Sequence, residues 1–331
     1  MIKKILLLLI SFLIGIGLFF WVFKMVGWGG VKEALTVFTG WHGLAILGLT
    51  FVMAAIATLK WQEILKGVGV KVSFGGLVGP YLAAFAVMFL APILVWGGEI
   101  FRTYILKERN SIPWSKGMAS VVIDRILEWT ANLTVILFGG LFFLFLIGFP
   151  PTKILVVFGG IFLILLGGMF FFYFKILKRE SIVSFFIGND KPLETEKEIF
   201  DFFKNSKRAM WKSFALAFLR VGVACFRVWL LVVFLGKSLG LLSSFSILTF
   251  SYLSMVIPIP AALGSHEALQ TFAFGSLGLG ASTATAFTMI IRGAELMVAL
   301  AGVIILFKLG IALVGKNLFK KLSSLSGNNG T

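Results

Sequence analysis

The sequence contains little cysteine, histidine or acidic charge for its length. Its 331 residues include one cysteine, two histidines and 14 acidic residues. Cys225 alone can form neither an intramolecular disulfide nor a thiolate metal site, and His42 and His266 are too few for a histidine-rich metalloprotease site. Charged residues make up only 13% of the chain, which excludes a water-exposed protein of this size. We therefore predict no metal, no cofactor and no catalytic residue, and the protein is not expected to be an enzyme.

Long apolar runs take up most of the chain. Hydrophobic residues make up 59% of it and the mean hydropathy is +1.02. Runs of about 20 uncharged residues are long enough for transmembrane helices, whereas an outer-membrane barrel would alternate apolar and polar residues. The sequence predicts an all-α polytopic membrane protein. Its eight apolar runs are 5–23, 44–59, 74–96, 117–149, 154–174, 213–235, 238–263 and 282–307.

The basic residues decide between two topologies. Lys and Arg number 30, and the net charge of +16 is read as an orientation signal and an attraction to anionic lipid, so no nucleic-acid partner is expected. Outside the apolar runs lie 26 basic residues, and eight crossings would divide them 15 to 11. If the runs 74–96 and 238–263 instead enter the membrane and return to the side from which they came, 22 of these basic residues lie on the cytoplasmic side and 4 on the other side. This second division fits the positive-inside rule, with both termini in the cytoplasm.

Proline and glycine interrupt the two runs where re-entrant hairpins would turn. The first run holds Pro92 and is followed by Gly98, and the second holds Pro258 and Pro260 and is followed by Gly264. These residues release backbone groups that only protein or a water-filled cavity can satisfy at that depth. We predict six spans plus two re-entrant hairpins in the cytoplasmic membrane. Kinked helices that cross eight times are the alternative.

The remaining segments are read as parts of a single membrane domain over residues 1–331. The run 5–23 exceeds a signal-peptide core and lacks a cleavage site, so we expect a retained span. Residues 175–212 form a basic cytoplasmic loop, and residues 308–331 form a cytoplasmic tail. Within the loop, the Thr195 to Glu198 stretch resembles a capping box before an amphipathic helix, which we expect at the lipid interface; a solvated loop is the alternative.

Matched polar positions indicate an internal repeat. Pro92 precedes Glu99 by seven residues, as Pro260 precedes Glu267. The Arg-x-x-Glu pair at Arg125 recurs 167 residues later. The repeat units would be 44–149 and 213–307, with three crossings between the two hairpins, so the second unit is inverted. Transporters with inverted repeats place their substrate site near the bilayer midplane, where broken helices meet.

Charged residues inside the apolar runs mark the candidate site. Each costs about 2.5 to 3.5 kcal/mol if it faces lipid at the bilayer centre, so we expect them to face the protein interior or a cavity. Asp124 is one of them. The arginine fork suits phosphate oxygens, so a lipid phosphate is the expected ligand, with glutamates at the hairpin tips as gates. Structural ion pairs are the alternative. The candidate substrate-binding residues are Glu99, Arg102, Arg125, Glu128, Arg220, Arg227, Glu267, Arg292 and Glu295.

These motifs resemble the transmembrane region of lysylphosphatidylglycerol synthases, a flippase-like integral membrane family. The matching elements are Gly98-Glu99-x-x-Arg102, the Arg125 segment, Ile257-Pro258-Ile259-Pro260 leading to Gly264-x-x-Glu267, and the Arg292 span, over about residues 5 to 310. The resemblance implies that the membrane part moves aminoacylated phosphatidylglycerol, and this chain is similar to stand-alone members without the soluble synthase domain. It departs from the family at Ala261-Ala262, where a Gly-Gly pair is usual, and at Gly98 and His266, where a basic residue is frequent.

Two functions remain open from the sequence. The first is a lipid flippase or translocator that moves an anionic, aminoacylated or glycosylated lipid without ATP, since no phosphate-binding loop is present. The second is a non-transporting accessory protein that binds lipid or a lipid-linked sugar for a partner synthase or glycosyltransferase. A third function, that of an intramembrane transferase, is not favoured because the sequence has no recognisable set of catalytic residues.

Overall fold

The computed structural model of the chain describes residues 40–90, 97–148, 152–181, 193–256 and 265–326. Within these ranges the protein is built from α-helices, and no strand occurs. The prediction of an all-α protein is therefore confirmed. The apolar run 5–23 and the predicted turn residues Pro92, Pro258, Pro260 and Gly264 lie outside the described residues.

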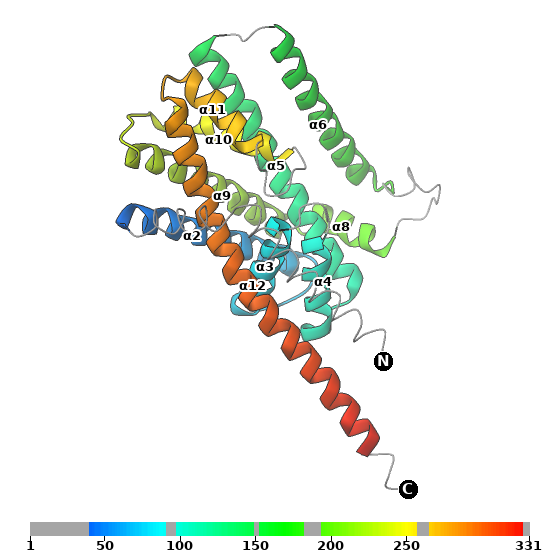
Figure 1. Cartoon of the computed structure of the whole chain (residues 1–331). Helices are drawn as coiled ribbons and strands as arrows, with labels where there is room; N and C mark the ends of the chain where they lie inside the picture. Colours follow the sequence, from blue (N-terminus) through cyan, green and yellow to red (C-terminus); the bar gives the residue numbers. More distant parts are fainter. Residues whose placement is uncertain (1–39, 91–96, 149–151, 182–192, 257–264, 327–331) are drawn as a thin grey trace.

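In the described part of the chain, one group of four helices comes before α6 (Thr152–Lys178) and α8 (Glu194–Asn205), and a second group of four comes after them (Figure 1). The first group consists of α2 (Trp41–Gly67), α3 (Phe74–Leu90), α4 (Gly97–Asn110) and α5 (Trp114–Ile147). The second group consists of α9 (Lys207–Phe234), α10 (Leu241–Val256), α11 (Ser265–Ser276) and α12 (Ala281–Ser326). Each group thus has a long helix, two short helices and another long helix.

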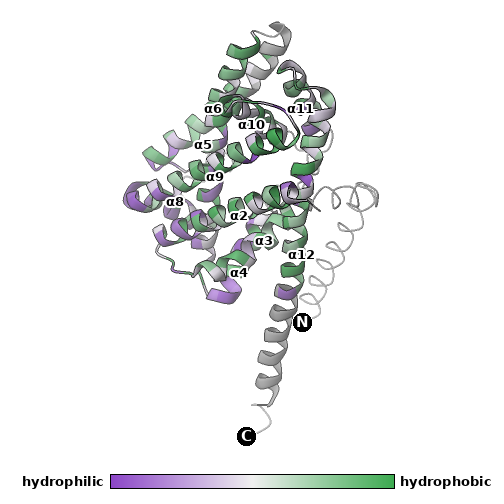
Figure 2. Ribbon diagram, turned by 90° about the vertical axis from the view of Figure 1, so that its left-hand side faces the viewer, coloured by the Kyte–Doolittle hydropathy of each residue, from purple (hydrophilic) through white to green (hydrophobic). Residues whose placement is uncertain are grey.

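Four of the described helices are long and apolar enough to cross a membrane, namely α2, α5, α9 and the Ala281–Lys308 part of α12. With 27 residues, α2 is about 40 Å long, which exceeds a hydrocarbon core of about 30 Å. Large apolar side chains are exposed on the outer helices, as expected for a surface in lipid. Examples are Phe138, Phe145, Leu163, Ile164 and Phe170. Most of the described ribbon is hydrophobic in colour, and hydrophilic residues gather on α4 and α8 (Figure 2).

The four short helices pack in consecutive pairs, α3 against α4 and α10 against α11. Between the two groups, α2 lies beside α9, α3 packs on α12, and α10 packs on α5. In Figure 1, α5 runs upward to its junction with α6, whereas α12 runs downward to the C-terminus. The last long helices of the two groups therefore run in opposite directions.

Gly98 lies in the first turn of α4 and not in a turn between helices, as the sequence had suggested. A Cβ atom added there would lie 2.6 Å from Met88 Cγ and 2.8 Å from the carbonyl oxygen of Ala84. The missing side chain lets the start of α4 approach α3 closely. This contact fixes the position of Glu99, the next residue in the chain.

The amphipathic helix expected in the basic segment is α8, but two features differ from the prediction. Its N-terminal cap is formed at Leu193, whose backbone N–H donates to Glu196 Oε2 at 3.0 Å, so Thr195 is not the cap. Ser181 also donates to Glu196 Oε2, at 2.8 Å. The apolar residues Ile199, Phe200, Phe202 and Phe203 are buried, and α8 packs against α5, α6 and α9. The face that we assigned to lipid is therefore packed against protein.

Candidate functional site

A cluster of buried charges lies where α2, α4, α5 and α9 meet, and we call it the first cluster. Arg125 of α5 donates from Nε to Glu99 Oε1 and from Nη1 to Glu128 Oε2, the latter at 3.1 Å. Glu99 is 2% exposed and belongs to the first turn of α4, where the helix dipole favours a carboxylate. The predicted Arg125–Glu128 pair on one face of α5 is confirmed.

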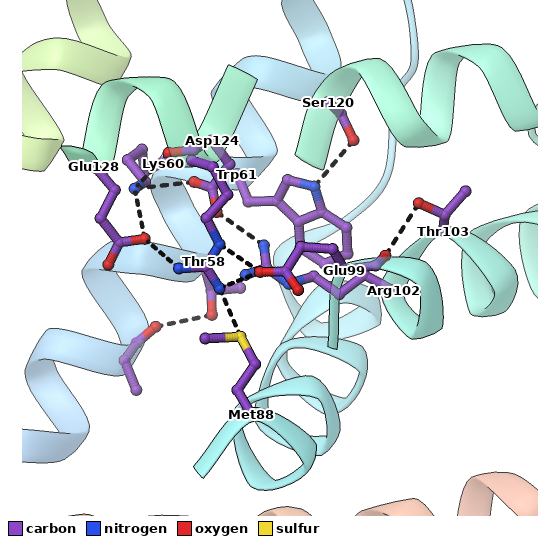
Figure 3. A network of polar contacts seen from close by, with 12 residues as sticks. Thr58, Lys60, Trp61, Met88, Glu99, Arg102, Thr103, Ser120, Asp124 and Glu128 are labelled. Carbon is purple, nitrogen blue, oxygen red and sulfur yellow. Dashed lines mark hydrogen bonds and ion pairs between the residues drawn. The ribbon is translucent and has the colours of Figure 1, made fainter. Parts of the chain in front are cut away.

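Glu128 is the carboxylate on which three cations converge. Arg220 of α9 donates from Nη1 to Glu128 Oε1, while Arg125 holds Oε2 from its own helix. Lys60 of α2 places Nζ 3.9 Å from the same Oε2 atom. The three cations come from three different helices, so Glu128 joins α2, α5 and α9 at one point. Figure 3 shows Lys60 close to the carboxylates of both Asp124 and Glu128.

Asp124 holds two further contacts one turn before Glu128. Lys60 Nζ lies 3.0 Å from Asp124 Oδ1, and Arg102 Nη1 of α4 donates to Oδ2 at 2.9 Å. The guanidinium carbon of Arg102 lies 5.0 Å from the ring centres of both Trp61 and Tyr81. Cation–π attraction therefore adds to the ion pair, because the rings are also buried.

A small cavity opens beside Glu128. Its polar lining includes Lys60, Glu128, Asn132, Arg220 and Tyr252, and its apolar lining comes from α5 and α9. The space has room for about one water molecule. Two cations and one carboxylate at its wall make it a place where an anionic group would be stabilised.

The second cluster lies between α2, α9, α11 and α12. Arg227 donates from Nη1 to Thr50 Oγ1 at 2.9 Å, and its Nη2 lies 3.5 Å from Glu295 Oε1. Arg292 Nη1 lies 3.1 Å from Glu267 Oε1. Helices α2 and α9 contribute to both clusters, since Lys60 and Arg220 belong to the first.

The nine predicted residues are all charged groups with ionic partners in these two clusters. Glu99, Arg102, Arg125, Glu128 and Arg220 lie in the first cluster, and Arg227, Glu267, Arg292 and Glu295 in the second. Arg220 and Arg227 both belong to α9 and are seven residues apart. The structure assigns them to different clusters. Among the described residues, no group of three His, Cys, Asp or Glu could hold a metal ion.

Sequence reasoning missed Lys60 of the first cluster, and it expected Asp124 in the interior without including it among the candidate substrate-binding residues. Lys60 ended an apolar run and was counted as a loop residue, yet it lies inside α2 and is 1% exposed. A signal was present, because Arg227 follows Lys60 by 167 residues, the same offset that relates Arg125 to Arg292. Without the buried Lys60 and Arg102, the division of basic residues that the sequence predicts changes from 22 to 4 into 20 to 4.

Comparison with known proteins agrees with the membrane architecture. The family profile described as the lysylphosphatidylglycerol synthase TM region matches residues 8–302. A UPF0104 membrane protein of Methanocaldococcus jannaschii is 24% identical over 309 residues, which covers 88% of this chain and 90% of the relative. A UPF0104 membrane protein of Pyrococcus horikoshii is 23% identical, over 82% of this chain and 88% of the relative. A third, from Methanothermobacter thermautotrophicus, is also 23% identical, over 81% and 85%.

Proposed function

The chain belongs to the lysylphosphatidylglycerol synthase TM region family, and we propose that it translocates a lipid across the cytoplasmic membrane. The first cluster would bind the phosphate of an anionic, aminoacylated or glycosylated lipid. The observation that carries the proposal is the convergence of Lys60, Arg125 and Arg220 on Glu128 at the wall of a cavity. The protein would act as a translocator and not as an enzyme.

The charge balance of the first cluster supports an anionic ligand. The cluster contains four cations and three carboxylates, which leaves one positive charge in surplus. A lipid phosphodiester carries a single negative charge, so its entry would balance the cluster. Arg125 and Arg220 both present planar donors that can move from a carboxylate to phosphate oxygens without losing their charge. Glu128 would release one of them when the phosphate arrives.

The arrangement of the two helix groups supports an inverted repeat. If the two groups are equivalent, α3 corresponds to α10 and α5 corresponds to α12. The contact of α3 with α12 then corresponds to the contact of α10 with α5, and both contacts are present. Two ion pairs also recur: Arg125–Glu99 corresponds to Arg292–Glu267. Lys60–Glu128 likewise corresponds to Arg227–Glu295. Such a pseudo-symmetric pair of units can expose a midplane site alternately to the two sides.

The short paired helices fit the proposed re-entrant hairpins. With 17 and 16 residues, α3 and α10 are each about 25 Å long, which is less than the hydrocarbon thickness of about 30 Å. Each packs against the helix that follows it. We propose six spans with two hairpins, both termini in the cytoplasm, and Glu99 and Glu267 near the hairpin tips as gates.

Reconstituted transport tests this function. The full chain is incorporated into vesicles, and the movement of head-group-labelled phosphatidylglycerol and aminoacylated phosphatidylglycerol between leaflets is measured. Arg220→Ala should lower the rate by about tenfold or more, because a charge-assisted contact to phosphate is lost. Arg208→Ala is the matched control, since Arg208 is exposed on the same helix.

The outcomes separate the two candidate functions. Equal rates for Arg220→Ala and Arg208→Ala would rule out the first cluster as the phosphate site. Binding of lipid without movement of any tested lipid would favour the accessory role for a partner synthase or glycosyltransferase.

A further inference from the structure

An apolar groove lies between α5 and α6. Its lining is made of Trp129, Leu133, Ile164, Leu165, Gly168 and Met169, and its volume is about 280 Å³. None of these side chains carries a charge. Close to the groove, Thr130 Oγ1 and the Tyr173 hydroxyl share a hydrogen bond of 2.8 Å that attaches α6 to α5.

The groove and the polar cavity occupy neighbouring stripes of one helix. Glu128 and Asn132 line the cavity, whereas Trp129 and Leu133, each one residue further along, line the groove. Consecutive residues of an α-helix are rotated by about 100° and separated by about 1.5 Å along the axis. The cation-rich cavity and the apolar groove are therefore at the same depth of α5 and face adjacent directions.

We propose that the groove holds an acyl chain of the lipid whose phosphate lies beside Glu128. This inference rests on the proposed function for the identity of the ligand. A lipid needs an apolar channel and an anion site at matched depth, and the two stripes of α5 supply both. Apolar walls would reject a polar occupant, because its hydrogen-bonding groups would stay unsatisfied.

Glycine keeps the α6 side of the groove open. A Cβ atom added at Gly168 would meet no atom within 4 Å, so protein packing does not require glycine there. A larger side chain at this position would enter the groove without displacing the backbone. Gly167 is equally unobstructed but does not line the groove. The two neighbours form a matched pair, since both gain the same helix propensity on substitution.

Photolabelling of the full chain in vesicles tests the proposal. The probes are a phosphatidylglycerol with a diazirine on one acyl chain and a diacylglycerol with the same chain but no phosphate. Adducts are mapped by mass spectrometry. The phosphate-bearing probe should label the groove about tenfold more than diacylglycerol, because a hydrogen bond to a charged group is strong enough for that ratio. Labelling at Phe145 and Leu219, which are exposed elsewhere, should not distinguish the probes.

The glycine variants complete the test. Gly168→Leu should remove most groove adducts, while Gly167→Leu should retain them. Equal labelling by the two probes would mean that bulk lipid merely fills the groove and would overturn the proposal. Equal labelling of the two variants would overturn it as well. Specific groove adducts in a protein that moves no lipid would uphold the acyl site and reject transport, so the two failures are distinguishable.

Discussion

Arg102 Nη1 and Asp124 Oδ2 lie 2.9 Å apart, and both side chains are almost fully buried. The pair joins α4 to α5 inside the first cluster. Removing one partner of a buried ion pair leaves the other charge uncompensated. Asp124 would retain Lys60 at 3.0 Å, which limits the loss.

Arg102→Ala should therefore lower the free energy of unfolding by about 3 kcal/mol. Part of this loss comes from the stacking of Arg102 over Trp61 and Tyr81. Thermal unfolding in detergent measures the change. Arg109→Ala, at an exposed position of the same helix, should leave the transition in place. An unchanged transition for Arg102→Ala would show that the pair does not stabilise the fold.

The close approach of α10 to α5 depends on one glycine. A Cβ atom at Gly139 would overlap Thr249 Oγ1 and lie 2.9 Å from the carbonyl oxygen of Phe245. Gly139→Ala should destabilise the protein by about 1 to 3 kcal/mol, since the helices must move apart. At Gly140 the nearest atom, Thr249 Cγ2, is 3.9 Å away, so Gly140→Ala should be neutral or slightly stabilising. Equal unfolding temperatures for the two variants would contradict this contact.

The helical class could be predicted from the sequence because apolar runs of span length have few other stable forms in lipid. The ends of the helices were harder to predict from the sequence. A charge at position 60 ends an apolar run, but α2 continues to Gly67 because Trp61, Ile64 and Leu65 are buried against other helices. What makes a buried Lys60 tolerable is Asp124, which is 64 residues away in the chain. A hydropathy value averaged over a local stretch of sequence cannot reveal a partner that is so distant in the chain.

The sequence could predict which charged residues belong to the site, but not which of them form ion pairs with each other. Penalties for charge in the membrane identify which residues must be interior, and the repeat offset groups them. Which cation meets which carboxylate depends on helix packing. Arg125 pairs with Glu128 on its own helix, as spacing alone suggests. Glu295 instead meets Arg227 of α9, which lies 68 residues earlier in the chain. Such non-local pairing follows only from the fold.

The topology predicts on which side α4 ends. In a Cys225→Ser background, a cysteine at Glu108 should react with an impermeant maleimide only from the cytoplasmic side if the first hairpin is re-entrant. A cysteine at Lys237 should react only from the opposite side, which serves as the control. Labelling of the Glu108 position from outside would instead support eight crossings. The basic residues Lys107 and Arg109 that flank this position are exposed, so the reagent has access.

The second cluster allows function to be separated from stability. Arg292 Nη1 lies 3.1 Å from Glu267 Oε1, and the Glu267 side chain is 40% exposed. A partly exposed ion pair contributes about 1 kcal/mol or less to stability. Glu267→Gln should therefore leave thermal unfolding nearly unchanged. If the second unit takes part in alternating access, however, the same variant should lower lipid transport by about tenfold.

Arg179→Ala provides the comparison for that experiment. Arg179 and Asp201 form a 3.0 Å ion pair that is also exposed but lies outside both clusters. Its loss should change neither stability nor transport. Arg292→Ala should reproduce the transport defect of Glu267→Gln, and the double variant should be no worse than either single variant, since residues of one interacting pair are not additive. Transport that survives both single substitutions would exclude the second cluster from the pathway and leave the first cluster as an isolated anion site.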